Sequence, residues 1–160
     1  AHQRRVIAAI RKYQPDMILC NAPEDRHPDH GRSAQLVEDA AFLAGLRKIE
    51  TFDAGVLQPA WKPAYVFHYI QDRFLQPDFV VDITDVFEKK LESIKAYATQ
   101  FHNPGIDGPE TYISKPGFIE SVIYRAKMFG KMIGVDYAEG FISDKMIGIS
   151  TLDALVKKDT

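Results

Sequence analysis

A cluster of side chains suited to metal binding lies near the start of the chain. Two of the five histidines fall within the six residues Asp25-Arg26-His27-Pro28-Asp29-His30. Imidazole is a common zinc ligand, and a neighbouring carboxylate can hold its other ring nitrogen. Pro28 restricts the backbone at its own position and at His27, which helps to fix the directions of the side chains around it. The segment therefore has the parts of half a metal site.

An alternative explanation involves no chemistry. In this case the six side chains are solvated loop residues, and Asp29 or His30 only caps a helix that begins near Gly31. A catalytic zinc ion normally has three protein ligands, whereas this segment supplies one or two. The residues alone therefore leave both explanations open.

The elements on either side place this cluster at the end of a predicted strand. Apolar residues recur at helical spacing between Val6 and Tyr13, and the run Met17-Ile18-Leu19-Cys20 is typical of a strand buried on both faces in a parallel sheet. A second amphipathic stretch follows Gly31 and extends through Leu46. This order indicates an α/β fold, in which ligands bind just outside the carboxyl ends of the strands.

The rest of the chain continues the alternation of strands and helices. Residues 65–70 and 79–83 predict strands, and the apolar spacing over 87–101 and 119–133 predicts helices, the second ending at Gly134. Residues 102–116 hold three of the nine prolines and predict a surface loop. Because no linker divides these elements, we predict a single domain over residues 1–160.

Composition excludes several classes of protein. The 20 Lys and Arg against 22 Asp and Glu give a net charge of -2, so there is no net basic field to bind nucleic acid or an anionic membrane. The apolar runs are far shorter than the roughly 20 residues that cross a bilayer. Cys20 is the single cysteine, and no secretory signal opens the chain, so we expect a cytoplasmic protein. The chain begins with Ala1 rather than methionine, and we expect it to be part of a longer protein.

Several separated segments resemble one protein family. The run from Asp25 to Gly31 resembles the second motif of the LmbE-like, or PIG-L, family of zinc-dependent N-deacetylases. The segments that resemble its bacillithiol-pathway branch are Pro77 to Ile83, Ala96-Tyr97 with Gln100-Phe101, and Ile133 to Phe141. The resemblance covers nearly the whole chain and implies a three-layer, Rossmann-like α/β sandwich with a mostly parallel sheet.

The resemblance also implies a role for each residue of the motif. His30 corresponds to the metal-binding histidine, and His27 to the histidine whose imidazolium form stabilises the oxyanion of the tetrahedral intermediate. Asp29 would orient and support His27, and Arg26 would contact the substrate. These roles suit the residue types, because a carboxylate favours the charged ring and a cation stabilises developing negative charge.

The family's first motif, an Ala-His-Pro-Asp-Asp segment that supplies the other metal ligands and the general base, is absent from the sequence. We therefore expect the C-terminal part of an LmbE-like fold, without its N-terminal strands and inactive alone. Phe118 stands where some relatives place a tyrosine, and Tyr112 is a candidate to supply that hydroxyl. We expect His68, between Phe67 and Tyr69 in a predicted strand, to be a structural histidine rather than a ligand.

The function implied by the resemblance is zinc-dependent release of acetate from N-acetylglucosaminyl-malate in bacillithiol biosynthesis. The expected partners are this small-molecule N-acetylated sugar conjugate and further copies of the chain in a homo-oligomer. The alternative is a non-catalytic fragment or degenerate relative that serves in subunit association or sugar binding. Metal content separates the two, because a catalytic site needs about one zinc ion per chain.

Overall fold

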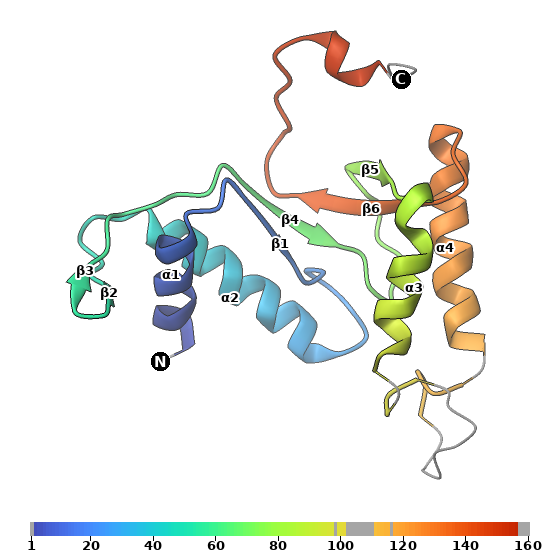
Figure 1. Ribbon diagram of the computed structural model, residues 1–160, viewed down its shortest axis with the longest axis horizontal. Helices are drawn as coiled ribbons and strands as arrows, with labels where there is room; N and C mark the ends of the chain where they lie inside the picture. Colours follow the sequence, from blue (N-terminus) through green and yellow to red (C-terminus); the bar gives the residue numbers. More distant parts are fainter. Residues whose placement is uncertain (1, 98, 102–110, 116, 157–160) are drawn as a thin grey trace. The chain divides into compact units, whose positions relative to one another are not determined.

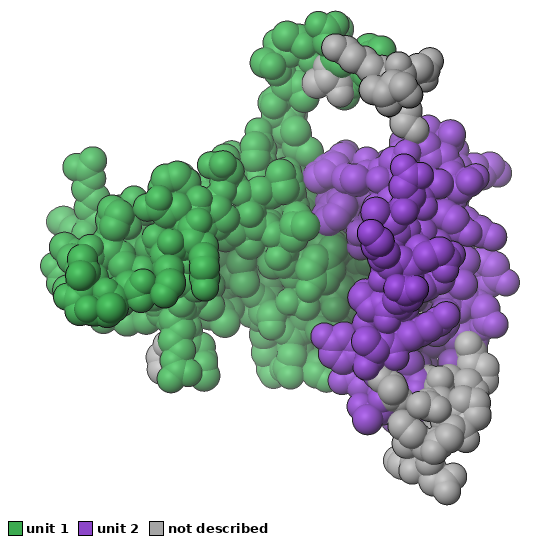
Figure 2. Space-filling model, in the orientation of Figure 1, with its two compact units in different colours: residues 1–76, 142–160 green, residues 77–141 purple. Residues whose placement is uncertain are grey.

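The computed structural model describes residues 2–97, 99–101, 111–115 and 117–156, and the chain divides into two compact units. Unit 1 consists of residues 1–76 and 142–160, and unit 2 of residues 77–141, as Figure 2 shows by colour. The chain leaves unit 1 after residue 76 and returns to it at residue 142. That residues 1–160 form one domain stays a prediction.

Unit 1 is built on a parallel pair of strands. Its elements are α1 (His2–Tyr13), β1 (Met17–Cys20), α2 (Pro28–Ala44), the short strands β2 (Phe52–Asp53) and β3 (Val56–Leu57), β4 (Tyr65–Tyr69) and the 3-10 turn η2 (Leu152–Leu155) (Figure 1). β1 pairs in parallel with β4, with Met17 opposite Tyr65 and Cys20 opposite His68. A parallel pair needs a crossover connection, which contains α2. The predicted α/β class is thereby confirmed.

The two helices of unit 1 pack through small side chains. Ile7 and Ile10 of α1 are buried against Ala40, Ala41 and Ala44 of α2. Alanines lack the bulk that would hold the helix axes apart, so α1 approaches α2 closely along this face. The contact fixes the carboxyl-terminal half of α2.

A buried guanidinium completes this helix pair. Arg11 is only 3% exposed and donates hydrogen bonds to the carbonyl oxygens of Ala44, Leu46 and Ile49 and to the hydroxyl of Thr51. The carbonyls at the carboxyl end of a helix carry partial negative charge and lack partners within the helix. Arg11 therefore satisfies the end of α2 and the turn that follows it.

β1 is less buried than its sequence predicts. Met17 and Leu19 are 51% and 54% exposed, whereas Cys20 is buried. The prediction of a strand covered on both faces is wrong for the described chain. A continuous apolar run shows that a strand suits burial, but it cannot show that the same chain provides a layer over each face.

Unit 2 combines an antiparallel strand pair with two helices. It contains β5 (Phe79–Asp82), η1 (Thr84–Val86), α3 (Phe87–Lys95), α4 (Gly117–Ile133) and most of β6 (Ala138–Ser143). β5 pairs antiparallel with β6, with Phe79 opposite Phe141. Phe87 and Leu91 of α3 are buried with Ala126 of α4, and the Tyr137 ring stacks on Phe87 at 3.7 Å between centroids. The strand pairs of the described chain are therefore of both kinds.

The predicted end of α4 is correct, whereas the predicted end of α3 is too late in the sequence. α4 ends before Gly134, whose φ of +74° is the left-handed conformation expected of a C-terminal glycine. α3 ends at Lys95, short of the predicted range over 87–101. The loop predicted over 102–116 lies mostly outside the described residues. In the described part of the chain, every helix is too short or too polar to cross a bilayer.

Candidate active site

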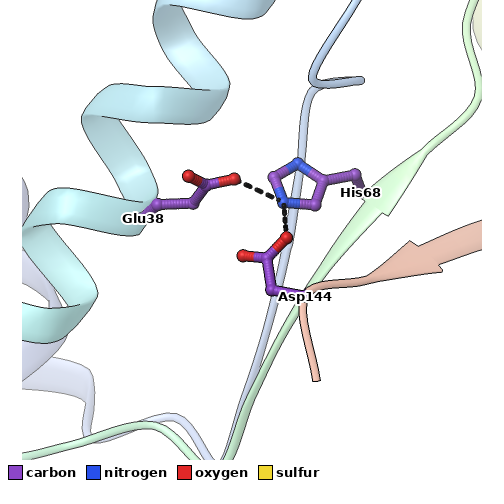
Figure 3. Close-up of side chains that lie close together, drawn as sticks. All are labelled: Glu38, His68 and Asp144. Atoms are coloured by element: carbon purple, nitrogen blue, oxygen red, sulfur yellow. Dashed lines mark ion pairs between the residues drawn. The ribbon is translucent and has the colours of Figure 1, made fainter. Parts of the chain in front are cut away.

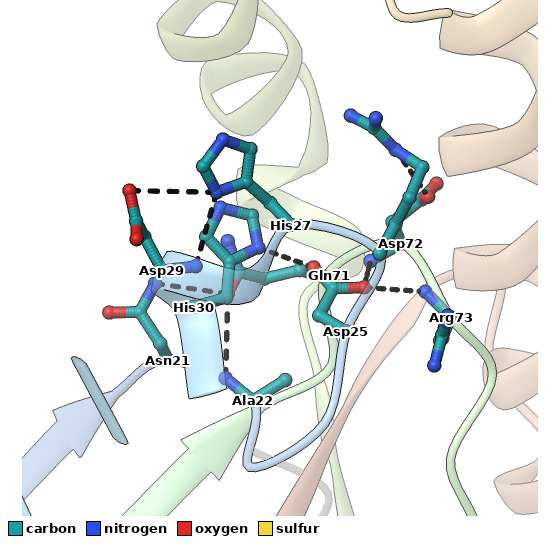
Figure 4. A network of polar contacts seen from close by, with 10 residues as sticks. Asn21, Ala22, Asp25, His27, Asp29, His30, Gln71, Asp72 and Arg73 are labelled. Carbon is teal, nitrogen blue, oxygen red and sulfur yellow. Dashed lines mark hydrogen bonds and ion pairs between the residues drawn. The ribbon is translucent and has the colours of Figure 1, made fainter. Parts of the chain in front are cut away.

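The predicted cluster lies where the sequence places it, at the carboxyl ends of two parallel strands. The segment after β1 and the segment after β4 meet there, because parallel strands end at the same edge of a sheet. The Asn21 side-chain amide donates to Gln71 Oε1 at 3.0 Å, and the Ala22 backbone N–H lies 3.4 Å from the same oxygen (Figure 4). These contacts hold the two segments together beneath the histidines.

Asp25 joins the same two segments through a buried carboxylate. Its side chain is 1% exposed, and its Oδ1 accepts the backbone N–H groups of Asp72 at 3.2 Å and Arg73 at 2.9 Å. Its Oδ2 pairs with Nδ1 of His30. Burial opposes ionisation of Asp25, but the hydrogen bonds from Arg73 and His30 outweigh it and lower the pKa of this carboxyl. Asp25 is therefore a charged anchor inside the loop.

His30 is oriented as metal-binding histidines usually are. Its Nδ1 faces the Asp25 carboxylate, so Nε2 is the ring nitrogen left for a ligand. Its side chain is 32% exposed, so solvent or an ion can reach it. The His27 ring lies 5.3 Å away between centroids, and Figure 4 shows the two imidazoles side by side. The structure thus brings together His27 and His30, both predicted as site residues.

His27 itself forms the N-cap of α2. Its Nδ1 accepts the backbone N–H of Asp29 at 3.2 Å, so in the neutral ring the proton belongs on Nε2. The helix is therefore capped by His27, not by Asp29 or His30 as the alternative explanation supposed. Asp29 Oδ2 lies 3.9 Å from the same nitrogen, while Asp29 Oδ1 contacts Arg32 at 3.2 Å. Asp29 contributes charge near His27 without a direct hydrogen bond to its ring.

The remaining motif residues shape the rim of the site. Arg26 Nε lies 3.3 Å from Asp72 Oδ2, and the Arg26 side chain is 43% exposed. Gly31 leaves room for the loop, because a Cβ at this position would lie 2.8 Å from the carbonyl oxygen of Pro23. The first turn of α2 can therefore approach the loop only with glycine here.

Outside this cluster, the structure locates three more of the residues considered from sequence. His2 is exposed on α1. Tyr112 and Phe118 contact each other edge to face at 5.8 Å between centroids, within unit 2. Both were expected to serve in packing if not at a site, and their rings pack. His102 lies outside the described residues.

Sequence reasoning missed the residues that hold the cluster in place. The motif that was predicted to form the site contains Asp25, but no role was assigned to it, and Gln71 was not predicted as a site residue. Both act across more than forty positions, Asp25 with Asp72 and Arg73, and Gln71 with Asn21. The single available signal was a carboxylate five residues before His30, a spacing that points to no particular contact.

Comparison with known proteins identifies relatives of the chain. No protein-family model matches the sequence. The chain is 32% identical over 143 residues to a diacetylchitobiose deacetylase from Thermococcus kodakarensis, covering 86% of this chain and 48% of that protein. It is 29% identical over 101 residues to a 4-oxalmesaconate hydratase from Pseudomonas putida, covering 61% of this chain and 38% of that protein. The chain therefore spans about half, or less, of the length of these curated relatives.

A solved structure extends the likeness to three dimensions. The conserved protein TT1542 from Thermus thermophilus superposes with a TM-score of 0.75 at 27% identity, over 93% of this chain and 61% of that one. One curated relative is a deacetylase and the other a hydratase, so kinship alone does not fix the reaction. The chain has the LmbE-like α/β fold, and its relatives support membership of the LmbE/PIG-L superfamily without singling out the bacillithiol-pathway branch.

Proposed function

We propose that this chain carries part of the active site of a metal-dependent N-deacetylase that releases acetate from an acetylated amino sugar. The observation that carries the proposal is the pairing of His30 with buried Asp25, next to His27, at the carboxyl edge of β1 and β4. The relationship to a diacetylchitobiose deacetylase supports this class of reaction. The more specific proposal is that the ion is zinc and the substrate N-acetylglucosaminyl-malate.

The residues present fit one ligand position of such a site. His30 would bind the ion through Nε2, since Asp25 occupies Nδ1. Among the described residues, no group of three close ligand atoms includes His30, and we propose that its further ligands lie outside them. A bound metal ion would supply two things: it would polarise the amide carbonyl, and it would lower the pKa of a water molecule so that hydroxide, the stronger nucleophile, is available.

The other motif residues act on the substrate directly. His27 would donate from Nε2 to the carbonyl oxygen as it becomes negatively charged, because its Nδ1 is committed to the backbone of Asp29. The Asp29 carboxylate lies 3.9 Å from His27 Nδ1 and would help to orient that ring. Arg26 lies at the rim, where a guanidinium can bind the carboxylates of a malate group. The ion pair with Asp72 would position the Arg26 side chain before the substrate binds.

The test is acetate release by the protein expressed from its whole coding region. Its intact mass is compared with the 18.1 kDa of this chain, and zinc is counted per chain. The substrates are N-acetylglucosaminyl-malate, diacetylchitobiose and N-acetylglucosamine. We expect the first to be the best substrate, in a cytoplasmic homo-oligomer whose size sedimentation measures.

Three variants separate the assigned roles. His27→Ala should lower kcat roughly 100-fold or more while zinc stays bound, as losing one oxyanion donor does. His30→Ala should hold one zinc ion fewer per chain than the wild type, and His2→Ala, an exposed control on α1, should change neither kcat nor zinc content. An unchanged zinc content in His30→Ala would overturn the ligand assignment. Sugar binding without acetate release, in a wild-type protein free of metal, would favour the non-catalytic alternative.

A further inference from the structure

A second cluster in unit 1 surrounds the one fully buried histidine of the described chain. His68 lies on β4 with 0% of its surface exposed. Its Nδ1 is 2.7 Å from the backbone carbonyl oxygen of Asn21. A carbonyl oxygen can only accept, so Nδ1 must carry a hydrogen. The Cys20 sulfur lies 3.3 Å from the same nitrogen and remains a thiol, because burial raises the pKa of Cys20 to about 12.

The other ring nitrogen faces two carboxylates. Glu38 Oε1 of α2 lies 2.9 Å from His68 Nε2, and Asp144 Oδ1, just after β6, lies 3.8 Å from it (Figure 3). The Asp144 contact is too long for a hydrogen bond, and the Glu38 contact is attractive only if a positive charge lies at Nε2. Within the described chain, this buried nitrogen has no hydrogen-bond partner. His68 was expected to be a structural histidine with both ring nitrogens satisfied. Nδ1 has such a partner in Asn21, whereas Nε2 has none among the described residues.

The charges of this cluster are balanced only if a proton or a metal ion lies between the ring and the carboxylates. With Nδ1 protonated, a neutral ring directs the Nε2 lone pair at carboxylate oxygens, which is repulsive. Glu38 and Asp144 also offer oxygens within 4.8 Å of each other, so two carboxylates face the same nitrogen. Either a proton between Nε2 and Glu38 Oε1 or a metal ion would relieve the repulsion.

The arrangement matches the ligand pattern of a metal better than that of a proton. A metal-bound histidine usually donates its second ring N–H to a carbonyl or carboxylate, as His68 does to Asn21. One ligand atom each from Glu38, His68 and Asp144 lie within 4.8 Å of one another. Ligands about 2.0–2.1 Å from one tetrahedral ion lie about 3.3 Å apart, so a small movement of Asp144 would close the set. Asp144 is 58% exposed and can make it.

We propose that Glu38, His68 and Asp144 bind a divalent transition-metal ion, separate from the ion proposed at His30. One imidazole nitrogen and two carboxylate oxygens suit zinc or cobalt. A pocket of about 330 Å³, lined by Glu38, Phe42, Lys62 and Asp144, opens beside the cluster and gives the ion and its water ligands a route in. The ion would tie α2, β4 and the segment after β6 together, and so stabilise unit 1.

The test uses the 160-residue chain, stripped of metal with a chelator and titrated with Zn²⁺ by calorimetry. Co²⁺ serves as a second probe, because its absorption spectrum reports coordination by nitrogen and oxygen. The fluorescence of Trp61, the single tryptophan and a residue of unit 1, reports unfolding in urea with and without Zn²⁺. We expect one tight site per chain and a higher urea midpoint with Zn²⁺.

The variants decide which residues bind. Asp144→Asn changes an exposed side chain and Glu38→Gln a half-buried one, so both should fold, and each should weaken Zn²⁺ binding about tenfold or more. Asp39→Asn, the neighbouring exposed carboxylate on α2, and His30→Ala should bind as the wild type does. The proposal is overturned if Asp144→Asn and Glu38→Gln bind Zn²⁺ like Asp39→Asn, or if His30→Ala abolishes the tight site. It is also overturned if the wild type binds no Zn²⁺, and nitrogen NMR of His68 then shows whether a proton lies on Nε2 instead.

Discussion

Replacing Asp25 by asparagine isolates the contact that orients His30. Both backbone N–H groups donate to Oδ1 of Asp25, whereas His30 pairs with Oδ2. An asparagine can keep its oxygen at the first position and place its amide NH₂ at the second. The variant therefore retains the backbone bonds but sets one donor against another at His30 Nδ1.

The expected cost follows from these contacts. A hydrogen bond to a charged group is worth about 1.5–3 kcal/mol, so Asp25→Asn should lower the free energy of unfolding by about 2 kcal/mol. Asp25→Ala removes all three interactions and should cost about 3–4 kcal/mol. Asp29→Asn is the control, because Asp29 is 65% exposed and makes only surface contacts, worth less than about 1 kcal/mol.

The asparagine also changes which nitrogen of His30 carries the proton. Its NH₂ group can be satisfied only if Nδ1 accepts, which moves the proton to Nε2, the nitrogen proposed to bind zinc. Loss of such an outer carboxylate typically weakens metal binding 10- to 100-fold. Asp25→Asn should therefore bind zinc more weakly than wild type in the whole protein.

Urea unfolding followed by Trp61 fluorescence measures the stability change in unit 1. The lowered pKa of Asp25 sets the pH dependence. A carboxyl whose pKa is lower in the folded state stabilises the protein above its unfolded pKa, about 3.9, and loses that contribution as pH falls through the folded pKa. The gap between wild type and Asp25→Asn should thus narrow below about pH 4. A gap under about 0.5 kcal/mol at pH 7, or one that widens from pH 5 to pH 3, would refute the reasoning.

Three further predictions concern other parts of the chain. Arg11→Met leaves the carbonyls at the end of α2 unpaired and should cost about 3 kcal/mol or more in urea unfolding, whereas Arg11→Lys should recover only part of the loss; equal stability of Arg11→Met and wild type would contradict this. Gly130→Ala places a Cβ 2.6 Å from the carbonyl oxygen of Val135, so it should lower the free energy of unfolding by about 1–3 kcal/mol despite the better helix propensity of alanine, which a lower melting temperature would show. Cys20, buried and with its pKa raised to about 12, should react with iodoacetamide at pH 8 far more slowly in the native chain than in urea, and equal rates would show that the thiol is accessible.

The position of His27 and His30 in the fold was predictable because it depends on local patterns. A short apolar run followed by a polar loop and an amphipathic helix indicates a strand, its carboxyl end and the next helix, and the loop with His27 and His30 lies at that end. Gly134 likewise marks the end of α4 through its own backbone preference. Signals of this kind are contained in ten or fifteen consecutive residues.

The features that were not predicted depend on contacts with residues far away in the sequence. The exposure of Met17 and Leu19 depends on whether another layer covers β1, which its own residues cannot specify. No strand was predicted over Ala138–Ser143, which forms β6 by pairing with its antiparallel partner β5. His68 looked ordinary within its strand, because Glu38 and Asp144 reach it from thirty and seventy-six positions away.

The residues of the cluster around His68 leave the ribosome at different times. Glu38 and His68 belong to the first stretch of unit 1, whereas Asp144 belongs to the stretch that follows the inserted residues 77–141. At about 5–20 residues synthesised per second, Asp144 would emerge roughly 4–15 s after His68. During that interval residues 77–141 can fold, because they form a compact unit of their own. The first stretch of unit 1 is then still without residues 142–160. A chain that stopped before residue 144 would contain Glu38 on α2 and His68 on β4 but would lack Asp144, the third member of the cluster.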